Sequence, residues 1–115
     1  MPSHVWRTDP VTIRGGATAT AFDYSIAKQI PNTHDREYTE KELWENLENW
    51  IKIITPIAEK KNIKLGIHPC DPPVENLGGI PQLFRSFDSY KKLINIVDSP
   101  SNAIEFCQGT FSEMD

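Results

Sequence analysis

Two strand-like segments on either side of one amphipathic segment constrain the fold more than any other feature of the sequence. The strands are expected at residues 63–68 and 103–107, and apolar spacing predicts a helix between them, capped near Ser86 and extending to Val97. The loop after the first strand is long, whereas the turn before the second is short. A strand, helix, strand order joins parallel strands, so residues 63–107 are expected to form a βαβ unit of an α/β fold. Long loops after strands are typical of a (β/α)8 barrel, whose sites lie at the strand C-termini.

A second helix is predicted before this unit. Thr39 and Glu42 have the spacing of a capping box. Pro56 is expected to kink or break the helix, because proline removes a backbone donor, and Trp44 is expected in the core together with Trp50. The apolar stripe of this helix consists of Leu43, Leu47, Trp50, Ile51, Ile54 and Ala58. The chain therefore divides into an irregular, loop-rich segment at 1–38, with a short helix near 22–29, and a regular core at 39–115.

Composition narrows the class of protein. The chain has 115 residues, of which 38% are hydrophobic and 24% charged, which excludes a disordered tail and a membrane protein. A net charge of −4 without a basic stripe argues against nucleic acid and anionic membranes as partners. Residues 1–7 lack the pattern of a secretory signal, and two cysteines are too few for a disulfide scaffold. A cytoplasmic protein is expected.

The chemistry-bearing residues of the βαβ unit are His68 and Cys107, each expected as the last residue of its strand. Alternation along the strands places both side chains on the same face, opposite the aliphatic residues, and at the same end of the sheet. Imidazole nitrogen and thiolate sulfur are ligands for divalent transition metals, and they also form a nucleophile and base pair. A lone strand-end histidine is more often structural, and a strand cysteine is usually a small buried hydrophobe.

Three further residues are weaker candidates. Cys70 and Asp71 lie in the loop just beyond His68, in a proline-bounded turn, and Cys70 is expected to be more exposed and more easily oxidised than Cys107. Arg14, followed by two glycines, has the chemistry to hold a substrate carboxylate, although such a triplet is often only a turn. Gly78-Gly79 is expected to be a turn or hinge.

The sequence resembles the mannonate dehydratases of hexuronate breakdown. The most specific segments are His-Pro-Cys-Asp-Pro-Pro at 68–73 and Phe-Cys-Gln-Gly at 106–109. The family normally has Asp at the position of Cys70, so this chain departs from the pattern there. The resemblance is carried by residues 14–18, 31–38, 42–47, 67–73, 77–81, 86–91, 97–100 and 106–110.

This resemblance implies part of a TIM barrel, to which both segments of the chain would belong. It implies a hydro-lyase that converts D-mannonate to 2-keto-3-deoxy-D-gluconate with Mn2+ or Fe2+. The family binds its metal with two His, one Cys and one Asp, and His68 and Cys107 match the first His and the Cys. The other two ligands and the acid and base residues come from later strands in the family, so this chain is expected to be inactive alone. The full-length enzyme could form a homo-oligomer.

Two alternatives remain open. A related metal-dependent sugar isomerase barrel would use the same strand ends, although isomerase sites favour carboxylate and histidine over thiolate. The chain could also be a non-catalytic barrel remnant in which His68, Cys70 and Cys107 are structural.

Overall fold

The computed structural model describes residues 7–114, so the expectation about a leader rests on residues that lie mostly outside the described part. The chain divides into two compact units. One contains the residues up to Glu37 together with Asn76–Ile80, and the other contains Tyr38–Glu75 together with the residues from Pro81 onward. Each unit is described by itself.

The first unit consists of short elements. Strands β1 (Val11–Thr12) and β2 (Thr18–Ala19) pair antiparallel around the 3-10 turn Arg14–Gly16. The expected short helix near 22–29 is confirmed as α1 (Tyr24–Ala27). Its N-cap is Asp23, whose carboxylate accepts a hydrogen bond from the backbone N–H of Ser25 at 2.8 Å.

The two adjacent glycines form a tight turn between strands β4 (Asn76–Leu77) and β5 (Ile80–Pro81). Gly78 and Gly79 have φ of +56° and +83°, the left-handed values that a two-residue hairpin turn requires. A Cβ at either position would collide with the side chain of Thr33 or Asn32. Gly78-Gly79 was expected to be a turn or a hinge, and the structure shows a turn.

Helix α2 (Glu40–Lys60) begins at the predicted capping box in the second unit. The hydroxyl of Thr39 accepts from the N–H of Glu42, and the Glu42 carboxylate accepts from the N–H of Thr39. A break at Pro56 is wrong, because the helix continues through it to Lys60, and the kink stays a prediction. Pro56 is on the exposed side of α2, as is Lys52, so water can solvate the Lys52 carbonyl that loses its donor.

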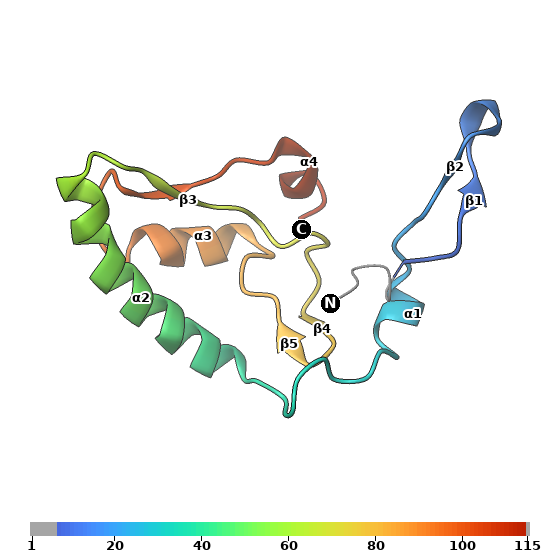
Figure 1. Cartoon of the computed structure of the whole chain (residues 1–115), viewed down its shortest axis with the longest axis horizontal. Helices are drawn as coiled ribbons and strands as arrows, with labels where there is room; N and C mark the ends of the chain where they lie inside the picture. The colour runs from blue at the N-terminus through green and yellow to red at the C-terminus, as the bar shows by residue number, and fades with distance from the viewer. Residues whose placement is uncertain (1–6, 115) are drawn as a thin grey trace. The chain divides into compact units, whose positions relative to one another are not determined.

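The parallel pairing of the βαβ unit is confirmed. Strand β3 (Leu65–Ile67) pairs parallel with β6 (Asn102–Ile104), and Ile67 lies opposite Ile104. Helix α3 (Phe87–Ile94) lies between them in the chain (Figure 1), and its N-cap is Ser86, as predicted. It ends before Val97, because the side-chain amide of Asn102 donates to the carbonyls of Leu93 and Val97 at its C-terminal end.

Both strands are shorter than predicted, and His68 and Cys107 lie beyond them. The N–H of Ile63 is used to close the end of α2, where it donates to the carbonyl of Ala58 at 2.9 Å. Pro69 follows His68 and has no N–H with which to extend the ladder. Cys107 is the N-cap residue of α4 (Gln108–Phe111), so the backbone has already left the strand at that point.

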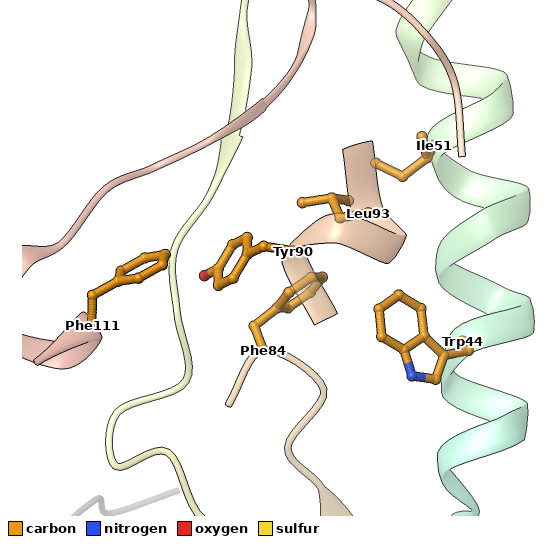
Figure 2. Close-up of a cluster of buried hydrophobic side chains, with 6 residues drawn as sticks. All are labelled: Trp44, Ile51, Phe84, Tyr90, Leu93 and Phe111. Carbon is orange, nitrogen blue, oxygen red and sulfur yellow. The ribbon is translucent and has the colours of Figure 1, made fainter. Parts of the chain in front are cut away.

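A core of six buried side chains holds α2, α3 and α4 together, as Figure 2 shows. Tyr90 lies at its centre, with ring centroids 5.3 Å from Phe84 and 4.9 Å from Phe111. Trp44 is buried as predicted, but the prediction for Trp50 is wrong, since that side chain is 48% exposed. The six residues are Trp44, Ile51, Phe84, Tyr90, Leu93 and Phe111.

The described residues thus form an α/β arrangement with one parallel strand pair, and they contain no closed barrel. Among residues 7–114, no helix combines the length and the apolar character needed to cross a membrane.

Candidate metal centre

His68 follows β3 directly, and its ring is held by the residue after it. Nδ1 lies 2.7 Å from the carbonyl oxygen of Pro69. A carbonyl can only accept, so Nδ1 carries the proton and the lone pair of the neutral ring lies on Nε2. This contact, followed by a hydrogen bond with Cys107, raises the pKa of His68 above its ordinary value. The carbonyl therefore leaves Nε2 to interact with Cys107, and a metal ion would bind there by replacing the Nε2 proton.

Cys107 lies where β6 has ended and α4 begins. The hydroxyl of Thr110 donates a hydrogen bond to Sγ at 3.4 Å. Interactions with the hydroxyl and the backbone N–H of Thr110, and then with the side chain of His68, lower the pKa of Cys107 to about 7. A large share of this thiol is therefore ionised near neutral pH, and the thiolate is the form that binds metals.

The structure brings His68 and Cys107 together, as their shared parity predicted. Each side chain acts on the pKa of the other, raising that of His68 and lowering that of Cys107, so the two groups lie near each other. Glu105 comes from the same face, since a Cβ on Gly66 would contact the Glu105 backbone and Cβ within 3.4 Å. The imidazole and the sulfur thus face a common space where two neighbouring parallel strands end.

The donor set suits a divalent transition metal. Such an ion binds a neutral imidazole and a thiolate, so it would take the place of the Nε2 proton of His68 and bind the Cys107 thiolate, whose pKa is lowered. Within residues 7–114, no group of three or more His, Cys, Asp or Glu residues is arranged to hold an ion. This part of the chain therefore offers two donors, and a complete coordination shell needs others.

The loop residues near His68 differ from each other in burial. Asp71 is exposed. Cys70 packs against the core, and its N–H donates to the carbonyl of Phe84 at 2.9 Å. Burial raises the pKa of the Cys70 thiol. Both cysteines are partly buried, and the pKa shifts favour Cys107 over Cys70 as the more ionised thiol, so the expected order of oxidation stays a prediction to be measured.

Arg14 belongs to the first unit, in the 3-10 turn between β1 and β2, and its side chain is exposed. Its contact with substrate stays a prediction.

Two residues near the pair were missed from the sequence. Thr110 contacts the sulfur of Cys107, and the hydroxyl of Tyr90 lies 3.4 Å from the carbonyl oxygen of Ile67, next to His68. The signal for Thr110 was its position three residues after Cys107, the spacing of an N-cap and its partner. The predicted second strand included Cys107, so this residue was not considered as the N-cap of a helix.

The two cysteines should react with iodoacetamide at different rates in the metal-free chain. The pKa of Cys107 is lowered to about 7, so at a pH below this value the thiol is protonated and is alkylated slowly. At a pH above this value the thiolate reacts. At pH 7.5 we expect Cys107 to be alkylated faster than Cys70, whose pKa is raised. Peptide mass spectrometry over time measures both rates in one sample. Faster labelling of Cys70 would show that the burial described for that loop is wrong.

Comparisons with known proteins agree on one family. The model of the D-mannonate dehydratase (UxuA) family matches residues 15–115. The chain is 34% identical to a mannonate dehydratase of Streptococcus uberis, over 97% of this chain and 39% of that protein. It is 43% identical to a mannonate dehydratase of Oceanobacillus iheyensis, over 89% of this chain and 29% of that protein.

A solved structure is also similar. The crystal structure of mannonate dehydratase from Streptococcus suis serotype 2 has a TM-score of 0.73 and 31% sequence identity, and the match covers 97% of this chain and 34% of that one. The chain thus covers 29% to 39% of the length of these three relatives.

Proposed function

Since the chain belongs to the D-mannonate dehydratase family, we propose that it forms part of an enzyme that dehydrates D-mannonate to 2-keto-3-deoxy-D-gluconate in hexuronate breakdown. The observation that carries this proposal is the pairing of His68 with Cys107 beyond two adjacent parallel strands. In the proposed complete fold, β3, α3 and β6 are one βαβ unit of a (β/α)8 barrel, and the pair lies at the C-terminal face where barrel enzymes act.

His68 and Cys107 are proposed as two ligands of one Mn2+ or Fe2+ ion. When bound, such an ion supplies Lewis-acid stabilisation of negative charge on the substrate. His68 donates through Nε2, because the carbonyl of Pro69 holds the proton on Nδ1. Cys107 donates as a thiolate, whose charge offsets part of the charge of the cation.

The reaction needs two proton transfers. The C2 hydrogen of D-mannonate lies next to a carboxylate, so its removal by a base leaves charge on the carboxylate oxygens. The C3 hydroxyl then leaves as water with a proton from a general acid, and the enol product tautomerises to the keto acid. Neither ligand is free for these transfers, so the base and the acid are assigned to other residues of the complete enzyme.

The family match favours this reaction over a sugar isomerase. The relatives compared with this chain are mannonate dehydratases. Cys107 supplies a thiolate, whereas isomerase sites favour carboxylate and histidine. The non-catalytic remnant remains the competing proposal, and it predicts that the His68 and Cys107 pair has no effect on dehydration.

The proposal is tested in a chimaeric enzyme, in which residues 15–115 of this chain replace the matching segment of the Streptococcus uberis protein. We expect the chimaera to form the keto acid from D-mannonate, to lose activity with a chelator, and to recover it with Mn2+ or Fe2+. The unaltered relative is the control. A folded chimaera that converts no D-mannonate, beside an active control, would contradict the proposed function.

A further inference from the structure

We propose that Thr110 is a positioning residue for Cys107, and that its hydroxyl fixes the direction from which Sγ binds the metal. The inference rests on the proposed function, because it assigns a role to a contact of a proposed metal ligand. It adds a residue that lies outside the predicted ligand set.

The first support is the geometry of the contact. The hydroxyl of Thr110 lies 3.4 Å from Sγ of Cys107 and donates to it. Thr110 is only 3% exposed, so water does not compete freely for this hydrogen bond. Cys107, in contrast, is only partly buried, and its sulfur faces the space that it shares with His68.

The second support is the rigidity of the element that carries Thr110. The next residue, Phe111, is buried, with ring centroids 4.9 Å from Tyr90 and 4.9 Å from Phe106. The contact of Phe111 with Tyr90 joins α4 to the core around α3 (Figure 2). Because Thr110 is buried and directly precedes Phe111, its hydroxyl has little freedom to move away from the sulfur.

The third support is that His68 is held in a comparable way. The carbonyl of Pro69 accepts from Nδ1 and leaves Nε2 for the metal. The Thr110 hydroxyl occupies one lone pair of the Cys107 sulfur and leaves the others. Each proposed ligand thus has one local hydrogen-bond partner that orients it, which is the usual role of outer groups in metal sites.

A purely structural reading is that the sulfur merely satisfies a buried hydroxyl at the start of α4. The two readings differ in what they predict for metal binding. If the sulfur only serves as the hydrogen-bond acceptor that the buried hydroxyl needs, removal of the hydroxyl changes the stability of the fold but leaves the thiolate bond to the metal unchanged. If it positions the sulfur, its removal changes both the affinity and the electronic spectrum of the bound metal.

The experiment uses the chimaeric enzyme described above, which supplies the remaining ligands, and Co2+, whose bond to a thiolate gives an ultraviolet charge-transfer band. The metal-free chimaera with the unaltered segment and its Thr110→Ser and Thr110→Val variants are titrated with Co2+, and band position and apparent affinity are recorded. Ser keeps the hydroxyl and Val keeps the shape without it. We expect Thr110→Val to weaken Co2+ binding about tenfold and to move the band to longer wavelength, because an undonated sulfur gives up its electrons more easily. Thr110→Ser should retain the wild-type band and affinity.

Cys107→Ser separates this inference from the proposed function. If the chimaera gives no Co2+ band that Cys107→Ser abolishes, the shared metal site fails, and the role of Thr110 fails with it. If the Cys107 band forms but is the same in Thr110→Val, only the role of Thr110 is overturned. Equal losses in the Ser and Val variants would also overturn it, since they would point to the methyl group. Circular dichroism checks folding, and if Val does not fold, Thr110→Ala takes its place in the same comparison with Ser.

Discussion

Replacing Cys107 by serine in the chimaeric enzyme should lower kcat/KM for D-mannonate by more than about 100-fold. Outer groups of metal sites typically change affinity or activity by about 10–100-fold, and the loss of a ligand itself should exceed that range. His68→Ala should have an effect of the same size, because Nε2 is the other proposed donor from this chain. Steady-state kinetics with saturating Mn2+ and bound-metal analysis measure the effect.

Cys70→Ser is the matched control for this prediction. Cys70 is a cysteine near His68 in sequence, but it packs against the core and donates its N–H to Phe84. Its replacement should change kcat/KM by only a few-fold, far less than the about 100-fold expected of a ligand. Losses of equal size for Cys70→Ser and Cys107→Ser would show that the two thiols are not divided between core and site as described.

The 115-residue chain by itself should form no keto acid from D-mannonate, whether or not Mn2+ or Fe2+ is added. Residues 7–114 place two donors together and no group of three or more. A metal held by two protein donors is bound weakly, and the proposed base and acid are not among those donors. A coupled assay for the keto acid, at high protein concentration, measures this against the chimaera as positive control.

The apolar surface of the chain bears on the same assay. Trp50, Ile53 and Ile57 on α2 are 48%, 68% and 54% exposed. Exposed apolar side chains promote association, so the sample should be checked for aggregation before inactivity is accepted. Keto-acid formation by the monodisperse chain, abolished by a chelator, would show that the chain carries a complete site.

Local signals in the sequence predicted much of the second unit. The capping box at Thr39 and the cap at Ser86 each depend on a few neighbouring residues, and the structure has both. The parallel pairing of β3 with β6 followed from the order of elements and the handedness of such connections. The closeness of His68 and Cys107 agrees with strand alternation, since each side chain shifts the pKa of the other.

The predictions failed where tertiary contacts determine the burial or the secondary structure of a residue. Trp50 has the spacing of an apolar helix face, but the buried face of α2 is the one that carries Trp44 and Ile51. Cys70 was predicted to be the more exposed cysteine because its neighbours are prolines and Asp, yet both cysteines are partly buried, and the N–H of Cys70 donates to the carbonyl of Phe84. Cys107 was assigned to a strand because it follows alternating apolar residues, whereas Thr110 and Phe111 hold it at the start of α4.

The shared ligand role of His68 and Cys107 is tested most directly by locating the metal. Crystals of the chimaera grown with Mn2+, with anomalous scattering recorded at the manganese edge, would show the position of the ion. The account predicts one anomalous peak in direct contact with Nε2 of His68 and Sγ of Cys107, with Nδ1 still donating to the carbonyl of Pro69. A peak that contacts only one of the two side chains, or that lies away from both, would contradict it.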